Sequence, residues 1–391
     1  MLELKVRKER VGPIRGRHPW VFSGALQNIP EGFESGEAVR LVDHNNNFLA
    51  QGYFNSYSQI AVRIWGWNEE EAIGEEFFES PVERAYDLRR EYVASKDTNA
   101  YRLINSENDL LPGLIVDKFN EYLVVQMHTK GIEAWKGPII AALVKIVKPK
   151  GIYERSDVRT RGMEGEEGKV GLLYGEVPDR VEIKENGLRF KVDIISGQKT
   201  GFFLDQRDKR AALIKYVKDK NVLNCFSYTG GFSLYALQGG AKKVVSVDSS
   251  EAAIAIAIEN TKLNGLDKRS ECEVVDVKEY LSRDVVKDFQ VIILDPPAFV
   301  KDRRKVKEGL QGYRKINEQA LRMMPPGGIL VTASCSAHVS LTDFRYMLSE
   351  AAGRAGRTVQ ILETFTHGID HPELVAFTEG EYLKCLFARV L

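Results

Sequence analysis

Short apolar runs alternate with amphipathic segments of helical length from about residue 186 onward. This rhythm predicts a doubly wound α/β sheet, in which most strands are followed by a helix that covers one face. The last two runs have no segment of helical length between them, so those two strands can form an antiparallel pair. The strands predicted here are residues 221–226, 242–248, 271–276, 289–295, 327–334, 359–363 and 382–390.

The first 185 residues follow two other patterns. Up to about residue 70, β-like runs separated by turns rich in Gly, Pro and Asn predict a small all-β barrel or sandwich. The acidic segment 68–76 marks a boundary, and the mixed patterns beyond it predict a connecting α+β domain. The predicted domains are therefore 1–70, 71–185 and 186–391. In the middle domain we expect helices at 77–95 and 134–149, a hairpin at 113–128, a strand at 151–157 and a mobile, exposed loop at 159–171.

Composition narrows the class of protein. Hydrophobic residues make up 43% and charged residues 28% of the 391 positions, which is typical of soluble globular proteins. No apolar run approaches the roughly 18–20 residues that span a membrane, and the N-terminal MLELKVRKER lacks the apolar core of a signal peptide. The four cysteines are widely spaced, which argues against a disulfide framework or a zinc site. We expect a cytoplasmic protein with reduced thiols and no metal.

Charge is balanced overall but clustered locally. A net charge of zero argues weakly against an indiscriminate nucleic-acid binder and leaves room for basic patches. Residues 5–17 contain six Lys or Arg against one acid, and residues 301–315 contain seven against two. Solvated surface charge explains either patch alone about equally well. The second patch gains weight because it directly follows a candidate site motif.

A turn that contains two glycines follows the first strand of the expected sheet. It runs from Asn224 to Gly231, and its glycines would let a ligand approach the backbone closely. Asp248 closes the next strand, where an acid can accept hydrogen bonds from ribose hydroxyls. The G-x-G-x-x-G spacing of pyrophosphate-binding turns is absent, so S-adenosylmethionine (SAM) fits better than a dinucleotide. Asp276, at the end of the third strand, is placed to meet the adenine amino group or to cap a helix.

A dense set of polar and aromatic residues precedes this first strand. The segment SGQKTGFFLDQR (196–207) holds two glycines and two phenylalanines among polar residues, which suits a loop better than a core strand. We expect this loop to cover the cofactor. Its end, Asp205 to Arg207, is expected to cap the next helix or to contact the methionine moiety.

Two polar turns follow later strands of the expected sheet. Asp295 opens the turn DPPAF (295–299), and Cys335 lies in the turn TASCS (332–336). The carboxyl ends of strands in open α/β sheets are where such folds bind ligands. An acid beside a flat Pro and Phe surface suits a planar base with N–H donors, and a thiol on a neighbouring strand can attack that base. The pattern suggests a methyltransferase that forms a covalent bond to a target pyrimidine.

Five motifs, in order along the chain, make a family match specific. They are SGQKTGFFLDQR, NCFSYTGGFSLYA, the DPPAF turn, the SCS turn and the closing HPELVAFTEGEYLKCLFARV. Together with RHPWVFSGAL (17–26), they resemble the large-subunit ribosomal RNA 5-methylcytosine methyltransferases that carry an N-terminal PUA domain. The resemblance spans nearly the whole chain. It implies a Rossmann-like SAM-dependent methyltransferase domain, a PUA-like domain that binds RNA, ribosomal RNA as substrate and a homodimer.

The resemblance implies roles that agree with the chemistry of the residues. C5 of cytosine does not take a methyl group from a sulfonium unaided, whereas a thiolate that adds to C6 makes C5 nucleophilic. Cys335 is then the nucleophile, and Asp295 is the hydrogen-bond partner of the N3/N4 edge of the base. The nucleophile must be a thiolate, and the sequence points to no particular cation for it.

The expected site residues fall into three groups. The catalytic residues are Cys335 and Asp295. The cofactor is expected to contact Gln198, Thr200, Gly201, Phe203, Asp205, Arg207, Phe226, Tyr228, Thr229, Gly230, Asp248, Ser249, Asp276 and Asp295. The RNA is expected to contact Pro296, Pro297, Phe299, Arg303, Arg304, Arg15 and Arg17.

Three other functions stay open. An RNA N-methyltransferase that acts on guanine or adenine would use the same DPPAF turn without a covalent adduct. A C5-uridine methyltransferase would use the same cysteine chemistry. A non-catalytic RNA-binding protein is the remotest alternative, because Asp248, Asp295, Cys335 and the turn glycines are all present.

Overall fold

The computed structural model describes residues 1–27, 29, 34–283, 288–300 and 302–391. These residues form two compact units, each assembled from several chain segments. Unit 1 consists of Met1–Ile183, Val192–Leu204 and Ile369–Gly380, and unit 2 consists of Lys184–Lys191, Asp205–Gly368 and Glu381–Leu391.

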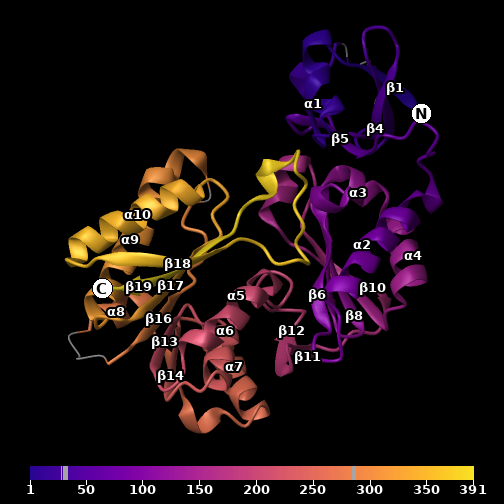
Figure 1. Cartoon of the computed structure of the whole chain (residues 1–391). Coiled ribbons are helices and arrows are strands. Elements are labelled where there is room, and N and C mark those ends of the chain that lie inside the picture. Colours follow the sequence, from indigo (N-terminus) through magenta and orange to yellow (C-terminus); the bar gives the residue numbers. More distant parts are fainter. Residues whose placement is uncertain (28, 30–33, 284–287, 301) are drawn as a thin grey trace. The chain divides into compact units, whose positions relative to one another are not determined.

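Unit 1 contains two five-stranded sheets (Figure 1). The first consists of β1 (Leu2–Lys5), β2 (Trp20–Phe22), β3 (Ala38–Val42), β4 (Phe48–Phe54) and β5 (Ile60–Gly66). The second consists of β6 (Ala100–Asn105), β7 (Leu114–Phe119), β8 (Tyr122–Met127), β9 (Gly151–Ser156) and β10 (Lys169–Gly175). Their strand orders are β1-β3-β4-β5-β2 and β10-β9-β8-β7-β6. Only β1 with β3 and β8 with β9 pair in parallel among these strands, so hairpins dominate both sheets.

Helices and shared aromatic residues join the two sheets of unit 1. The helices are α1 (Val11–Arg15), α2 (Glu79–Tyr92), α3 (Lys130–Ala134) and α4 (Lys136–Val147). Tyr53 of β4 and Trp65 of β5 are buried in the same hydrophobic cluster as Phe78, Leu103 and Ile139. The Trp65 and Phe78 rings meet edge to face at 5.3 Å, a favourable geometry for aromatic pairs. This cluster joins the two sheets, and the first sheet also has a core of its own that includes Leu4, Val39 and Ile64.

Most described side chains of residues 161–171 are exposed, as expected, but both ends of the expected loop 159–171 have regular structure. Residues 159–164 form a 3₁₀ helix, and β10 begins at Lys169. The Arg161 side chain is buried, and its guanidinium group pairs with Glu133 at 3.1 Å and with Glu166 at 3.0 Å. Because a buried guanidinium group needs compensating acceptors, the mixed Arg and Glu content of this segment serves internal ion pairs.

The chain passes from unit 1 to unit 2 and back within a two-stranded hairpin. Its strands are β11 (Arg180–Glu185) and β12 (Leu188–Asp193). The turn between them belongs to unit 2, where the Glu185 carboxylate accepts two hydrogen bonds from the buried Arg210 at 2.7 and 2.8 Å. This ion pair ties the turn to unit 2.

Unit 2 is built on a seven-stranded sheet. Its strands are β13 (Asn221–Cys225), β14 (Lys243–Asp248), β15 (Ser270–Val274), β16 (Val291–Leu294), β17 (Ile329–Ser334), β18 (Val359–Phe365) and β19 (Lys384–Val390). The order is β15-β14-β13-β16-β17-β19-β18. The first five strands pair in parallel, whereas β19 runs antiparallel to both β17 and β18. The expected α/β class and the antiparallel last pair are both confirmed.

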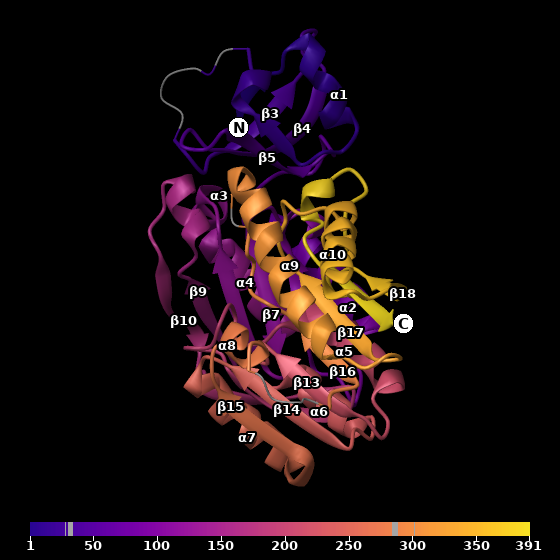
Figure 2. The same ribbon diagram turned by 90° about the vertical axis from the view of Figure 1, so that its left-hand side faces the viewer.

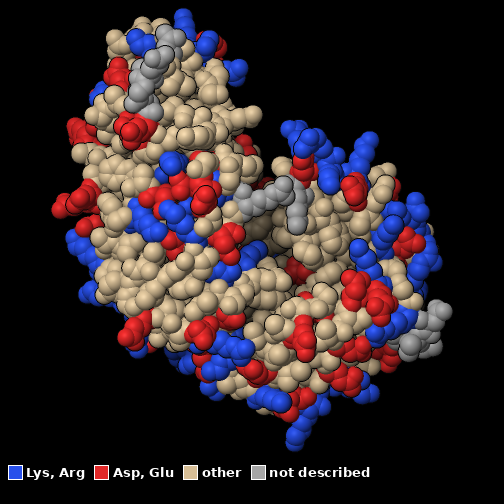
Figure 3. All heavy atoms as spheres, turned by 180° about the vertical axis from the view of Figure 1, so that it is seen from behind, with Lys and Arg blue, Asp and Glu red and all other residues tan. Residues whose placement is uncertain are grey.

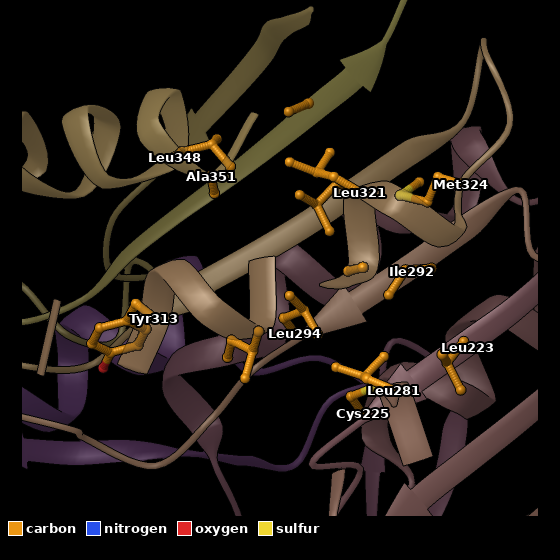
Figure 4. Close-up of a cluster of buried hydrophobic side chains, with 14 of the residues drawn as sticks. Leu223, Cys225, Leu281, Ile292, Leu294, Tyr313, Leu321, Met324, Leu348 and Ala351 are labelled. Atoms are coloured by element: carbon orange, nitrogen blue, oxygen red, sulfur yellow. The ribbon is translucent and has the colours of Figure 1, made fainter. Parts of the chain in front are cut away.

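Helices cover both faces of this sheet (Figures 1 and 2). They are α5 (Arg207–Leu213), α6 (Gly231–Gln238), α7 (Glu251–Leu263), α8 (Val277–Leu281), α9 (Val306–Met323) and α10 (Leu341–Ala355). Side chains of α8, α9 and α10 share one buried cluster with β13, β16 and β17 (Figure 4). Those of α5 and α6 share a second cluster with the other face of the same strands.

Local sequence explains why these elements form. All four residues of β16, VIIL, are fully buried, because a parallel strand covered on both faces needs apolar side chains in both directions. Helix α10 starts at a capping box, in which the Ser340 side chain and Asp343 satisfy each other's backbone N–H groups. It ends at Gly356, whose φ of 65° is the left-handed conformation that favours glycine.

We predict that Leu330→Ala destabilises unit 2. Leu330 lies in β17, is fully buried and belongs to the cluster of Figure 4, so its truncation should lower the free energy of unfolding by about 2–5 kcal/mol. Urea unfolding followed by circular dichroism measures this. All four tryptophans lie in unit 1, so their emission separates the two units. Tyr346→Ala, at a side chain 68% exposed, is the control, and equal midpoints for the two variants would contradict the prediction.

Candidate active site

The carboxyl ends of the central strands of unit 2 meet at one edge of its sheet. Cys225 of β13 lies in register with Val247 of β14 and with Leu294 of β16. Asp248 and Asp295 are the next residues on their strands. From β13 the chain winds outward first through β14 and β15, then in the opposite direction through β16 and β17. In α/β proteins, ligands bind at the strand ends where the winding reverses in this way.

The turn after β13 has an unusual backbone. Phe226, Tyr228 and Gly230 have φ values of 57°, 47° and 82°, and such conformations at non-glycine residues often mark functional sites. A Cβ atom at Gly230 would lie 3.1 Å from the Cβ of Ala257, so this position requires glycine. Thr229 is buried, and its carbonyl oxygen accepts a hydrogen bond from Asn260 at 3.0 Å. Tight packing therefore fixes the turn.

Asp248 joins this turn to the next helix. Its Oδ2 accepts the backbone N–H of Tyr228 at 2.9 Å, and its Oδ1 accepts that of Ser250 at 2.9 Å. Each carboxylate oxygen has two lone-pair sites, so each keeps acceptor capacity for a ligand hydroxyl. The neighbouring Ser249 is exposed. Ser250 begins α7 by accepting the N–H of Ala253.

Asp276 has the capping role that the sequence left open. Its Oδ1 accepts the backbone N–H groups of Lys278 at 2.8 Å and Glu279 at 3.3 Å, which begins α8. A cap of this kind satisfies N–H groups that would otherwise lack intrahelical partners. A contact of the same carboxylate with an adenine stays a prediction.

Asp295 is held by Gln206, which lies in the segment expected to cap the next helix or to contact the methionine moiety. Gln206 precedes α5 but makes no side-chain cap hydrogen bond there. The Gln206 amide nitrogen donates to both carboxylate oxygens of Asp295, at 2.9 and 3.0 Å. Gln206 is buried, so this contact fixes the orientation of the carboxylate. The two residues are 89 positions apart, and only the polar character of Gln206 within its loop hinted at a site.

A second carboxylate and a buried lysine complete this part of the edge. The Asp205 Oδ2 accepts a hydrogen bond from the Tyr382 hydroxyl at 2.7 Å, and the Lys209 ammonium donates to the Asp205 carbonyl oxygen. Burial lowers the pKa of Lys209, while the charges of Asp205 and Asp295 act in the opposite direction. Both acids therefore favour the charged form of this buried lysine. The Arg207 side chain is also buried and contacts Asp208.

Cys335 lies on the strand beside Asp295. Leu294 of β16 pairs with Thr332 of β17, and β17 ends at Ser334, directly before the half-buried Cys335. The next residue, Ser336, anchors the turn because its Oγ lies 2.9 Å from the Tyr313 hydroxyl and accepts the Val300 N–H at 3.2 Å. The structure therefore brings the two expected catalytic residues to neighbouring strand ends.

In the segment after Asp295, some side chains pack against the protein and others are exposed to solvent. Pro296 is buried and Pro297 is exposed. Phe299 packs against Tyr313 with ring centroids 4.6 Å apart. Arg303 and Arg304 are both exposed, and Arg304 pairs with Asp302 at 2.6 Å. Lys301, the first member of the basic run, lies outside the described residues.

The expected cofactor residues before Leu204 belong to unit 1, whereas those from Asp205 onward belong to unit 2. In unit 1 the Thr200 hydroxyl donates to the buried Asp117 carboxylate at 2.6 Å. Gly201 has a φ of 120°, and a Cβ there would meet the Asp193 carbonyl oxygen at 2.6 Å. Phe203 lies under the Lys199 ammonium at 4.4 Å, and Gln198 is exposed. Internal contacts therefore occupy much of this segment.

The two basic residues expected to touch RNA are exposed in unit 1. Arg15 contacts Asp43 at 3.3 Å, and the Arg17 guanidinium lies 5.3 Å from the centre of the Trp67 ring. Acidic and basic side chains are interspersed over the face shown in Figure 3, which agrees with the balanced composition.

Metal, disulfide and membrane features can be stated for the described part of the chain. There, no cluster of three or more His, Cys, Asp or Glu side chains is arranged to hold a metal ion. All four cysteines lie in the described part of the chain, and none of them forms a disulfide. Among the same residues, no helix has both the length and the apolar character needed to cross a bilayer.

The comparison with family models decides the class of enzyme. Residues 164–388, more than half of the chain, match the model described as S-adenosylmethionine-dependent methyltransferase. This chain belongs to that family. SAM is therefore the cofactor of this methyltransferase. Residues 4–67 match a PUA-like domain, which confirms the expected all-β domain at the N-terminus.

Relatives and solved structures of similar length agree with this assignment. The methyltransferase is 43% identical to "Ribosomal RNA large subunit methyltransferase I" of Tolumonas auensis, over 99% of this chain and 98% of that protein. It is 42% identical to the protein of the same name from Aliivibrio fischeri, over the full length of both. A proposed SAM-dependent methyltransferase from Streptococcus mutans aligns over both whole chains with a TM-score of 0.85 and 25% identity. A methyltransferase structure complexed with SAH aligns equally completely, with a TM-score of 0.86 and 25% identity.

We predict that Asp248→Ala weakens SAM binding by at least about tenfold. Hydrogen bonds to a charged acceptor contribute about 1.5–3 kcal/mol, and a tenfold change in Kd corresponds to about 1.4 kcal/mol. Isothermal titration calorimetry with SAM measures the change. Glu251→Ala, at an exposed acid in the first turn of α7, is the matched control. Equal affinity of the Asp248 variant and the wild type would remove Asp248 from the cofactor site.

Proposed function

We propose that this methyltransferase forms 5-methylcytosine in large-subunit ribosomal RNA through a covalent bond between Cys335 and C6 of the target base. The observation that carries the proposal is the placement of Cys335 and Asp295 at the ends of two adjacent parallel strands. The relatives named as large-subunit rRNA methyltransferases, with 42–43% identity over nearly the whole chain, support the class of substrate. A ribosomal substrate also fits the cytoplasmic location expected from the sequence.

The residues of the turn after β13 and the ends of β14 and β15 fit the cofactor. Asp248 retains acceptor capacity for ribose hydroxyls beyond its two backbone contacts. Asp276 accepts the helix N–H groups of Lys278 and Glu279 through its Oδ1, which leaves its Oδ2 able to meet an adenine amino group. The backbone of the turn at Phe226, Tyr228 and Gly230 allows close approach. When bound, SAM supplies an electrophilic methyl group on a sulfonium.

Cys335 and Asp295 then have different roles in the reaction. The Cys335 thiolate donates its electron pair to C6 of cytosine, and the C5–C6 π electrons move into the ring. Asp295, fixed by Gln206, binds the N3/N4 edge. Its carboxyl group accepts an N4–H hydrogen bond and shares a proton with N3, which offsets the negative charge that develops there. C5 can then attack the methyl carbon. Loss of the C5 proton to a base and departure of the Cys335 sulfur with its electron pair restore the aromatic ring.

The same site could serve nitrogen methylation or uridine, and two features favour C5 methylation of cytosine. Nitrogen methylation needs no nucleophile at C6, so a half-buried cysteine beside Asp295 favours C5 chemistry. C5 methylation of uridine would use the same thiol, so the thiol does not distinguish the two pyrimidines. They differ at the edge that Asp295 is proposed to meet. A carboxylate acceptor matches the N4–H donors of cytosine better than the O4 acceptor of uridine.

We predict that Cys335→Ala abolishes methyl transfer, since no other group supplies the bond to C6. Wild type and variant would be assayed with labelled SAM on large-subunit rRNA that lacks the modification, and the product nucleoside identified by mass spectrometry. Wild type should yield 5-methylcytidine. Cys272→Ala, at the other half-buried cysteine, should keep activity. SAM affinity and circular dichroism verify that both variants fold.

Other outcomes of this assay point to other functions. A Cys335→Ala variant that still methylates RNA would exclude the covalent route and favour nitrogen methylation. A product of 5-methyluridine would retain the thiol chemistry and change the base. RNA that contains 5-fluorocytidine provides an independent readout, because fluorine at C5 cannot leave as a proton and the covalent adduct should survive denaturing electrophoresis.

We also predict that the double variant Arg15→Gln, Arg17→Gln weakens RNA binding. Both arginines are exposed in the PUA-like domain, and each lost phosphate contact should reduce the slope of log affinity against log salt by about 0.7. Fluorescence anisotropy with labelled rRNA over a salt series measures both quantities. Arg90→Gln is the control, because it removes the charge of a side chain elsewhere in unit 1 that is 62% exposed. An unchanged slope for the double variant would exclude these arginines from the RNA contact.

A further inference from the structure

A lysine that the proposed chemistry does not use is buried next to Cys335. Lys384 is the first residue of β19 and pairs directly with Ser334 of β17, the residue before Cys335. Its side chain is only 1% exposed. Lysine is almost never fully buried unless its charge is paired or satisfied by hydrogen bonds. Its burial at this position therefore needs a physical reason.

The ammonium group of Lys384 is satisfied by neutral acceptors. It donates to the carbonyl oxygens of Ser336 at 2.8 Å and of Tyr382 at 3.0 Å. Within the described residues it forms no ion pair with a carboxylate. An ammonium group has three donors, so one N–H remains beyond these two contacts. The positive charge is thus kept at the turn that holds Cys335 and is not cancelled by a carboxylate.

The charges around Lys384 come from three elements and include the thiol. Burial lowers the pKa of the Lys384 ammonium. The charges of Glu381 before β19, Cys335 after β17 and Asp343 on α10 act in the opposite direction and raise it. The hydroxyl of Tyr313 on α9 faces the same turn through Ser336. Electrostatic interaction between two groups is mutual. If a Cys335 thiolate stabilises the charged form of Lys384, the Lys384 ammonium stabilises the thiolate by the same amount.

Resting on the proposed function of Cys335, we propose that Lys384 is a positioning residue that holds the 334–336 turn and favours the thiolate form of the nucleophile. The contact with the Ser336 carbonyl fixes the turn from one side, while the contacts of Ser336 Oγ with Val300 and Tyr313 fix it from the other. The thiol proton leaves to water, and the ammonium stays beside the sulfur as it adds to C6 and again as it departs. Thiolates next to a cation are the reactive form of cysteine in enzymes.

Thiol alkylation tests this without RNA. Cys225 and Cys385 are buried, so a Cys272→Ser background leaves Cys335 as the accessible thiol, with Cys335→Ala as blank. The rate of reaction with iodoacetamide against pH gives the midpoint of thiolate formation. Lys384→Gln keeps a hydrogen-bond donor for the Ser336 carbonyl and loses the charge, so its midpoint should rise by about one pH unit or more. Lys384→Arg keeps the charge and should stay nearer to the wild type.

The outcomes separate the possible roles of Lys384. A purely structural lysine would leave the midpoint of the glutamine variant unchanged, which would overturn the proposal. Circular dichroism and SAM affinity show whether the variants fold, and Lys384→Met replaces the glutamine variant if that one does not. In methyl transfer at neutral pH, kcat of the charge-free variant should fall about tenfold, with KM for RNA unchanged and activity recovering as pH rises.

Failure of this inference is distinct from failure of the proposed function. In one outcome, the enzyme makes no 5-methylcytidine while the midpoint of Cys335 thiolate formation still depends on Lys384. That result would support the role of Lys384 beside Cys335 and overturn only the proposed reaction. Conversely, 5-methylcytidine formation could require Cys335 while the midpoint of thiolate formation is the same with and without Lys384. That result would overturn only the role of the lysine.

Discussion

Parallel pairing at the centre of unit 2 is the constraint on which the site depends. Because β13, β14, β16 and β17 are held in register, the residues that follow each strand emerge at one edge. A shift of one residue would turn every side chain of a strand to the opposite face. The wholly apolar β16, buried on both sides, makes such a shift costly. The position of Asp295 relative to Cys335 is therefore set by the core and not by the loops.

A buried polar network adds orientation to this placement. Gln206 holds Asp295, Tyr382 holds Asp205, and the ammonium groups of Lys209 and Lys384 are bound to backbone carbonyls. These hydrogen bonds hold their groups in fixed orientations, because breaking one would leave a buried polar group without its partner. These contacts join four separate parts of the chain, residues 205–209, 295, 336 and 382–384, which is why one edge can hold several charged groups in fixed geometry.

The sequence predicted the parts of the fold that depend on local pattern. Every strand expected in unit 2 is present, since apolar runs such as VIIL identify buried strands directly. The three-residue β2 was not predicted, because so short a segment carries no periodicity. The burial of Arg161 was missed for a different reason: its partners Glu133 and Glu166 come from another helix and from the same segment, and composition alone suggested solvent.

Prediction of the site was limited by sequence separation. The strand-end acids Asp248 and Asp295 could be located because each follows an apolar run. Gln206 and Tyr382 could not be assigned, because their partners are 89 and 177 positions away and no local signal links them. Lys384 was part of a recognised motif, yet its burial depends on β19 pairing with β17. Tertiary contacts created these roles, so they were visible only in three dimensions.

The interleaving of the two units has a consequence for how the protein is made. The chain crosses between units after residues 183, 191, 204, 368 and 380, and β19 inserts between two strands that precede it. A chain emerging from the ribosome generally folds one domain at a time from its N-terminus. Here neither unit can close until residues 369–391 have been synthesised. The nascent methyltransferase must therefore hold two open cores at once, and its site is complete only after β19 has been added to the sheet.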